Sequence, residues 1–273
     1  MSNVCILTDS TVQFTRPNFP GHERVFVIPF EFQTSTQQGD ESWFRSGPAR
    51  RLIPPSPQEF IRFYAQLSRA YDTIFVLTLS SLLNPATRIA LSASLQYSNH
   101  ATINVIDSLT TGIGLGLLVQ SAAAAVSAGA PPAEIERRIR ASIPRIYMLF
   151  CIPELTYLAQ SGYMAWSQAL VGEMMGMLPI FAIEEGRLTP MEKVRTQRHL
   201  FESLQEFMNE FDDPAHIALV RSANQSNTRT RLVRQYVRET FPDTIFSEHA
   251  IAPHLAALFG PQSTGLVIME KLD

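Results

Sequence analysis

The sequence has little of several residue types whose presence marks particular classes of protein. Only two of its 273 residues are cysteine, Cys5 and Cys151, and both are flanked by apolar residues, so we expect reduced, buried thiols and no disulfide framework. Only two are lysine, Lys193 and Lys271, and no phosphate-binding loop ending in Gly-Lys-Ser/Thr occurs. These shortages disfavour Schiff-base enzymes and P-loop nucleotide-binding proteins. The formal net charge of −3 disfavours a nucleic-acid-binding protein, which would carry an excess of basic residues.

The sequence also lacks a convincing membrane-spanning segment. The most apolar stretch, residues 109–130, is interrupted by polar residues and four glycines, whereas a spanning helix needs about 20 predominantly apolar residues. Residues 112–116 invite comparison with a dinucleotide-binding loop, but the glycine spacing is wrong and no acidic residue follows about 20 positions later. The stretch therefore predicts a buried helix whose small residues allow close contact with a sheet. Residues 1–4 have no secretory signal character, so we expect a cytoplasmic location.

Strand-like and helical segments alternate through the first half of the chain. A helix begins after Ser56, where Pro57 and Glu59 form a strong start signal, and strands are predicted at 73–79 and 102–106. The run 25–32 is interrupted by Pro29 and predicts an edge or irregular strand. This alternation indicates parallel strands joined by helical crossovers.

The regular alternation of strand-like and helical segments ends at about residue 138. Strands are predicted at 146–152, 179–183, 216–220, 244–251 and 265–269, and helices at 196–211 and 226–241. We therefore predict an α/β fold of two lobes, at residues 1–150 and 151–273. The first lobe has a mostly parallel sheet, the second has a mixed sheet with helices, and the cleft between them is the expected ligand site.

Polar residues follow three of the predicted strands in the first lobe. They are Asp9, Ser10 and Thr11 after the first strand, Ser80 and Ser81 after the strand 73–79, and Asp107 and Ser108 after the strand 102–106. In an open α/β sheet, ligands bind at the carboxyl ends of the strands, so these groups are candidate ligand contacts. They are equally suited to capping the next helix or turn.

Two further residue groups leave alternatives open. A hydrolase using Ser80 or Ser81 is disfavoured because no nucleophile-elbow glycines surround them. The arginines Arg229, Arg231, Arg234 and Arg238 form either a solvated helix face or a docking surface for an acidic partner. Metal ligation is disfavoured because the histidines have no ligand spacing on a helix. They are His22, His100, His199, His216, His249 and His254.

An ordered series of short motifs covers nearly the whole chain. Its members are Thr8–Thr11, Pro55-Ser56-Pro57, Leu79-Ser80-Ser81, Val105–Ser108 with the glycines of 112–116, Leu155–Leu158, Leu178–Ile180, Glu185–Leu188, Lys193–Arg195, and Gly260-Pro261 with Gly265. No single motif is specific, but the ordered set resembles the DegV family of fatty-acid-binding proteins. The resemblance implies a non-enzymatic, two-lobed α/β protein that holds one long-chain fatty acid between its lobes, with the polar head near Ser80 and Asn84. It also implies that the carboxylate is presented to a bacterial fatty-acid kinase, and that no cofactor is needed.

The chain departs from the family pattern where the family holds the carboxylate. Leu52 stands where the family has a threonine, Asn84 where it has a serine, Tyr163 where it has an arginine, and Leu258 near the place of a histidine. Burying an acyl tail contributes roughly 0.8 kcal/mol per CH₂, against about 1–3 kcal/mol for a hydrogen bond to the head. Tail binding is thus expected to survive these changes, with Asn84 and the helix start at Pro85 still able to meet a polar head. The alternative is a divergent small-molecule sensor or regulatory binding protein that has lost carboxylate recognition.

Overall fold

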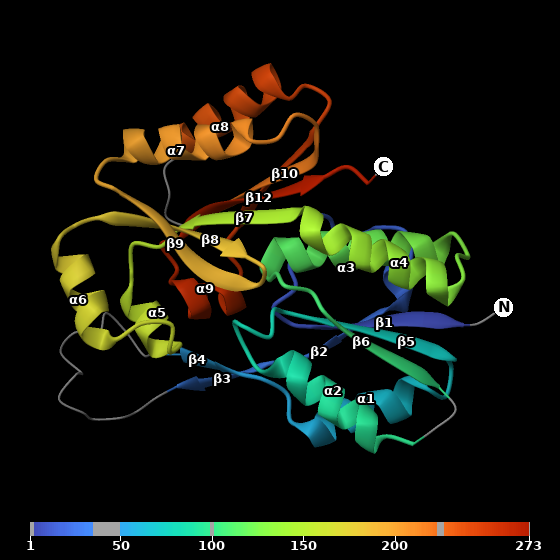
Figure 1. Ribbon diagram of the computed structural model, residues 1–273. Coiled ribbons are helices and arrows are strands. Elements are labelled where there is room, and N and C mark those ends of the chain that lie inside the picture. The colour runs from blue at the N-terminus through green and yellow to red at the C-terminus, as the bar shows by residue number, and fades with distance from the viewer. Residues whose placement is uncertain (1–2, 35–49, 99–100, 223–226, 273) are drawn as a thin grey trace.

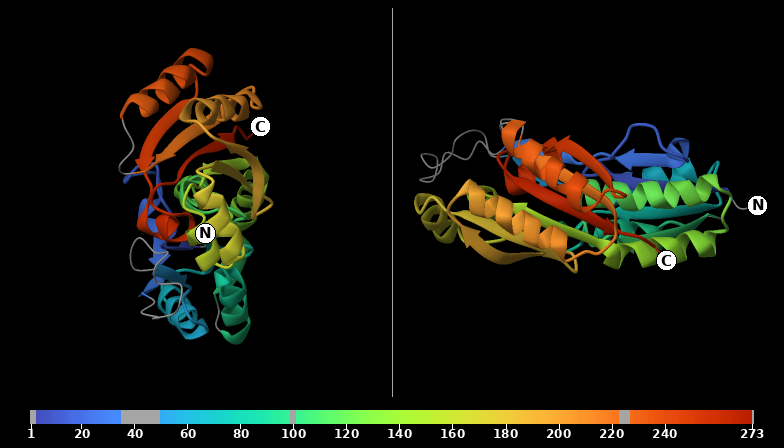
Figure 2. Two further views of the ribbon diagram at one scale, coloured as in Figure 1. Left: turned by 90° about the vertical axis from the view of Figure 1, so that its left-hand side faces the viewer. Right: turned by 90° about the horizontal axis from the view of Figure 1, so that it is seen from above.

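The computed structural model describes residues 3–34, 50–98, 101–222 and 227–272, and these residues form stacked layers of sheets and helices (Figure 1). A four-stranded parallel sheet has the strand order β2-β1-β5-β6, and a six-stranded mixed sheet has the order β11-β10-β12-β7-β8-β9. Helices lie between the two sheets and on both outer faces. The left-hand view of Figure 2 shows the same stacking, with the orange and red C-terminal helices at the top and the teal N-terminal helices at the bottom. The prediction of two α/β lobes, one mostly parallel and one mixed, is confirmed.

The N-terminal lobe is built around the parallel sheet. Its strands are β1 (Val4–Asp9), β2 (Val25–Ile28), β5 (Thr73–Thr78) and β6 (Thr102–Asp107). The short helix η1 (His22–Arg24) precedes β2, and a separate antiparallel pair is formed by β3 (Glu31–Thr34) and β4 (Arg50–Ile53). The predicted run 25–32 is thus divided at Pro29 between an edge strand and a second small sheet, because proline cannot donate to a ladder.

Helices α1 (Pro57–Leu67) and α2 (Ala86–Gln96) cover the outer face of the parallel sheet. The start of α1 is a full capping box: the Ser56 hydroxyl accepts from the Glu59 amide at 3.3 Å, and the Glu59 carboxylate accepts from the Ser56 amide at 2.7 Å. Between the helices, the buried Tyr64 hydroxyl donates to the carbonyl of Ala90 at 2.9 Å.

Replacing the capping serine tests how much this box contributes. Ser56→Ala removes the side-chain acceptor for the Glu59 amide and is expected to lower the free energy of unfolding by about 1 kcal/mol. Urea unfolding at neutral pH measures it, and Ser94→Ala, in the exposed last turns of α2, serves as the control. Equal unfolding midpoints for wild type and Ser56→Ala would contradict this role.

Helices α3 (Gly112–Ser127) and α4 (Pro132–Ser142) lie between the two sheets. The predicted buried helix in 109–130 is confirmed by α3, most of whose residues are buried. A Cβ on Gly114 would lie 3.0 Å from the Ile146 side chain in the second sheet, and one on Gly116 would lie 2.1 Å from the Gln13 carbonyl oxygen. Gly114 therefore allows the second sheet to approach α3 on one side, and Gly116 allows the loop after β1 to approach it on the other. Among the residues described, no helix combines the length and apolarity needed to cross a membrane.

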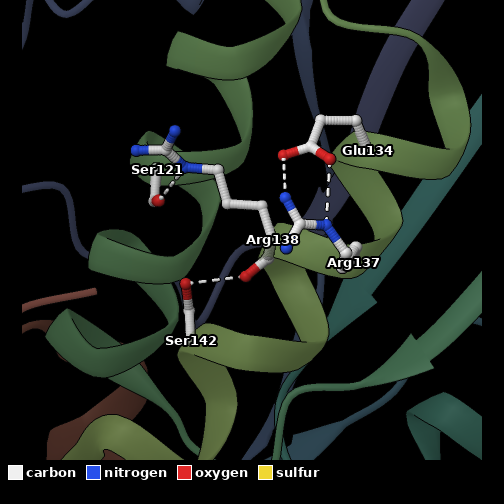
Figure 3. A network of polar contacts seen from close by, with 5 residues as sticks. All are labelled: Ser121, Glu134, Arg137, Arg138 and Ser142. Carbon is white, nitrogen blue, oxygen red and sulfur yellow. Dashed lines mark hydrogen bonds and ion pairs between the residues drawn. The ribbon is translucent and has the colours of Figure 1, made fainter. Parts of the chain in front are cut away.

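Several polar contacts lie along α4, and one of them joins it to α3 (Figure 3). Arg137 donates to both carboxylate oxygens of Glu134, one turn earlier in α4, at 2.9 and 2.7 Å. Arg138 donates to the Ser121 hydroxyl of α3 at 3.2 Å, while the Ser142 hydroxyl donates to the carbonyl of Arg138 at 2.9 Å. The two arginine contacts are solvent-exposed, so each contributes little to stability.

The C-terminal lobe is built around the mixed sheet. Its strands are β7 (Ile146–Cys151), β8 (Leu178–Glu184), β9 (Arg187–Val194), β10 (Pro214–Arg221), β11 (Ile245–Ala250) and β12 (Thr264–Glu270). Its helices are α7 (Gln197–Asn209) and α8 (Asn227–Thr240) on the outer face, α5 (Thr156–Gln160), α6 (Trp166–Met174) and α9 (Pro253–Phe259) on the other side, and η3 (Ile143–Arg145) before β7. All of β7 pairs within this sheet, so a division that followed strand pairing would fall before Ile146.

The two lobes share one apolar core. The largest cluster of buried side chains joins Phe75 and Leu77 of the parallel sheet to Phe150 and Val267 of the mixed sheet, with α3, α4, α5 and α9 between them. Smaller clusters lie under α1 and α2, and under α7 and α8. Cys5 and Cys151 are both buried, as predicted, and neither forms a disulfide.

Candidate functional site

Asp9 lies at the carboxyl end of β1 and is completely buried. One of its carboxylate oxygens accepts from the Thr11 amide at 2.8 Å and the Thr11 hydroxyl at 2.5 Å, and the other accepts from the Leu79 amide at 2.7 Å. Burial raises the pKa of Asp9 to about 6, although the hydrogen bonds from Thr11 and Leu79 act in the opposite direction. The carboxylate thus ties the loop after β1 to the end of β5.

Ser10 connects the same loop to the C-terminal lobe. Its hydroxyl accepts from the Phe30 amide at 2.8 Å and lies 3.2 Å from Nε2 of His254 on α9. The His254 ring stacks on Phe32 with a centroid distance of 4.8 Å, and burial lowers the pKa of His254. The Ser10–His254 contact joins residues that are 244 positions apart in the sequence, and it holds α9 against the carboxyl ends of the strands.

Ser80 follows β5 and is buried against the turn between β8 and β9. Its hydroxyl donates to the carbonyl of Gly186 at 2.6 Å. The turn has left-handed backbone at Glu185 (φ 48°) and Gly186 (φ 80°), and a Cβ on Gly186 would lie 2.4 Å from the Ser80 hydroxyl. The amide of the next residue, Ser81, donates to the Asp107 carboxylate at 3.2 Å. The Ser80 hydroxyl thus donates to a backbone carbonyl and not to a histidine, the usual base beside a serine nucleophile.

Asn84 and Tyr163 lie close together although they belong to different lobes. The Asn84 side-chain oxygen accepts from the amide of Ala86, the first residue of α2, at 3.2 Å. The Tyr163 hydroxyl donates to the carbonyl of Leu83, the residue before Asn84, at 2.6 Å. Burial raises the pKa of Tyr163, so the phenol stays neutral.

A large apolar cavity lies between α5 and α6 on one side and β8 and β9 on the other, with Tyr163 among its lining residues. All four elements belong to the C-terminal lobe, so this cavity is not the predicted cleft between the lobes. The volume of the cavity is about 770 Å³, within the range of about 300–1,000 Å³ that small-molecule sites occupy. Its apolar walls include Leu155, Leu158, Met164, Val171, Ile180 and Leu188. Lys193 is the one cation on its walls within the described part of the chain. The cavity therefore suits a hydrocarbon.

The other predicted site residues lie beside this region rather than on the cavity walls. Leu52 in β4 and Leu258 in α9 are both buried in the core shared by the lobes. The structure thus brings Ser80, Asn84 and Tyr163 to one junction between the lobes, while Asp9, Ser10 and Thr11 make internal contacts nearby. Their contact with a ligand stays a prediction.

The histidines and the arginines of α8 are the remaining candidate groups, and a docking role for the arginines stays a prediction. His100 and the side chain of Arg229 lie outside the described residues. Within the described ranges, no three His, Cys, Asp or Glu side chains are grouped closely enough to hold a metal ion. On α8, Arg234 is paired through two hydrogen bonds with Glu248, at 2.5 and 2.9 Å.

Comparisons with known proteins agree with this architecture. The sequence model of the DegV family, described as a family of uncharacterised proteins, matches residues 3–271. The chain belongs to the DegV family. A DegV domain-containing protein of Deinococcus radiodurans is 26% identical to it, with 99% of both chains covered. Protein DegV of Bacillus subtilis is 22% identical over 76% of this chain and 78% of its own length.

Solved structures of DegV family proteins have the same fold. A fatty acid binding DegV family protein from Streptococcus agalactiae superposes with a TM-score of 0.85 at 18% identity, covering 100% of both chains. The Streptococcus pneumoniae Fatty Acid Kinase (Fak) B3 protein, loaded with linoleic acid, gives 0.82 at 18% identity, covering 98% of this chain and 100% of its own. A DegV family protein from Eubacterium eligens, loaded with heptadecanoic acid, gives 0.80 at 17% identity, with the same coverage.

Proposed function

We propose that this DegV family protein is a carrier that holds one long-chain fatty acid, or a related single-chain acyl lipid, and performs no reaction of its own. The single observation that carries the proposal is the apolar cavity between α5, α6, β8 and β9. Burying about twelve methylene groups contributes on the order of 10 kcal/mol before the costs of association. The tail is therefore the main source of binding free energy.

Related proteins support the ligand class. The structures from Streptococcus pneumoniae and Eubacterium eligens are loaded with linoleic acid and heptadecanoic acid. We extend the proposal to the partner and the compartment: the carrier presents its lipid to a fatty-acid kinase in the cytoplasm. The kinase part rests on the likeness to the Fak B3 protein alone.

The polar head of the ligand is assigned to the junction between the lobes. Tyr163 and Asn84 supply uncharged hydrogen-bonding groups there, and Asn84 stands at the start of α2, where helix amides favour a negative charge. With Leu52 in place of a hydroxyl, head recognition contributes little compared with the tail. No cofactor takes part in the proposed function.

A bulky substitution inside the cavity tests the proposal. Leu188→Trp fills part of the space that the acyl chain needs, and we expect it to weaken palmitic acid binding by about tenfold or more. Thermal shift and calorimetric titration of lipid-free protein measure the binding, and mass spectrometry of protein purified from cells identifies its lipid.

The control is Leu91→Trp on α2, which adds the same side chain at an exposed position away from the cavity. It should bind palmitic acid as wild type does. Wild-type protein that carries no lipid from cells and shows no thermal shift with any fatty acid would refute the carrier function. That outcome would favour the small-molecule sensor instead.

A further inference from the structure

Methionines contribute to several parts of the wall of the apolar cavity. The lining residues include Met164 before α6, Met175 and Met177 between α6 and β8, and Met191 in β9. Met175 and Met191 are also open to solvent, with exposed fractions of 56% and 54%. A reagent dissolved in water can therefore reach two thioether side chains that belong to the cavity wall.

Both residues lie where regular secondary structure is interrupted. Met175 directly follows α6, which lies at the left-hand end of the molecule in Figure 1. Met191 lies in the edge strand β9, where the pairing with β8 includes Pro190 and Glu192 but skips the residue between them. Met191 is thus the extra residue of a β-bulge. At both positions, access from water is combined with a place on the cavity wall.

Oxidation changes methionine from an apolar to a polar side chain. Hydrogen peroxide transfers one oxygen atom to the thioether: a sulfur lone pair forms the S–O bond, the O–O bond breaks, and the second peroxide oxygen leaves as water. The sulfur is oxidised and the peroxide is reduced, each by two electrons. Methionine sulfoxide reductases reverse the change by using two thiols, which become a disulfide while the oxygen leaves as water.

We propose that Met175 and Met191 form an oxidation site for hydrogen peroxide, at which conversion to methionine sulfoxide weakens the binding of an acyl chain. This inference rests on the proposed function. An acyl chain in the cavity would cover the wall to which both side chains belong, and it has no donor for a sulfoxide oxygen. Because burying an unpaired polar group is unfavourable, oxidation of both residues is expected to weaken binding by about tenfold or more.

The experiment compares the affinity of lipid-free protein for palmitic acid before and after limited treatment with hydrogen peroxide. Peptide mass spectrometry records which methionines have gained oxygen. Wild type should lose affinity by about tenfold or more, and methionine sulfoxide reductases with a thiol should restore it. The double variant with Met175→Leu and Met191→Leu has no sulfur at the site. It should keep, after treatment, the affinity of its own untreated form.

The matched control is Met174→Leu. Met174 precedes Met175 in the chain and is more exposed, at 80%, but it does not line the cavity. It should oxidise readily in the wild type without effect on palmitic acid binding. Met174→Leu should therefore lose affinity on treatment by the same factor as wild type.

Three outcomes overturn the proposal and leave the carrier function intact. In the first, Met175 and Met191 stay unoxidised under conditions that oxidise Met174. In the second, both become sulfoxides and the affinity for palmitic acid does not change. In the third, the double leucine variant loses as much affinity as wild type, which places the sensitive residue elsewhere. If untreated wild type binds no fatty acid at all, the carrier function fails and the role of the oxidation site fails with it.

Discussion

Gly186→Ala is expected to lower the free energy of unfolding by about 2–4 kcal/mol, because it combines backbone strain with a steric overlap. Gly186 has φ 80°, a conformation that costs an L-residue roughly 1–2 kcal/mol. The new Cβ would lie 2.4 Å from the Ser80 hydroxyl and 3.0 Å from the Leu109 side chain. The β8–β9 turn would have to withdraw from the N-terminal lobe, so the Ser80–Gly186 hydrogen bond would be lost as well. Chemical denaturation of the purified protein measures the effect.

Two further variants separate the strain from the overlap. Gly129→Ala has the same kind of backbone, with φ 76°, but its Cβ would meet nothing within 4 Å, so it should cost only about 1 kcal/mol. In the double variant with Ser80→Ala, the closest overlap is removed, and the cost of Gly186→Ala should fall. If Gly186→Ala and Gly129→Ala destabilise equally, Gly186 is needed for its turn conformation alone and the close contact between lobes is unimportant.

The second large effect is a pH dependence of stability that originates at Asp9. Its pKa is raised by burial to about 6 in the folded protein, against about 3.9 in an unfolded chain. The folded state therefore binds more protons than the unfolded state between these two values. The stabilisation is fully present below about pH 4 and is lost as the pH rises through about 6. The loss from this one group is on the order of 2–3 kcal/mol.

Asp9→Asn removes the titrating group while keeping its size. We expect the difference in unfolding free energy between wild type and this variant to change by that amount between about pH 4 and pH 7, with wild type losing stability as the pH rises. Urea unfolding at a series of pH values gives the difference directly. Asp72→Asn, at an exposed carboxylate near the other end of the same sheet, is the control and should track wild type. A difference between wild type and Asp9→Asn that is constant with pH would show that Asp9 is ionised throughout.

The elements that the sequence predicts well are those with a local signal. The capping box at Ser56 and Glu59 and the break at Pro29 depend on residues only a few positions apart. The tight turn at Glu185 and Gly186 is marked by its own glycine. Strand β9 was not predicted, because Pro190 interrupts the segment and the adjacent charges Glu192 and Lys193 leave no alternating apolar pattern. Helix α6 was missed for a similar reason, since it buries only Ala169 and has no clear apolar stripe.

The sequence predicted polar residues at the edge of the parallel sheet but not their contacts, and their role in a ligand site stays a prediction. Polar residues after β1 and β5 were expected at the sheet edge, and they lie there. The partners of Ser80 and Ser10 are Gly186 and His254, which stand 106 and 244 positions away. No periodicity links residues so far apart, because their proximity depends on how the two lobes pack. The cavity itself depends on α6, which the sequence did not reveal.

The position of Lys193 on the cavity wall has a practical consequence. Lys271, the other lysine in the chain, is paired with Asp213 far from the cavity. An amine-reactive fluorophore would therefore label few sites, one of them on the cavity wall. Protection of that amine when a fatty acid is added would report binding of the proposed ligand without any engineered tag.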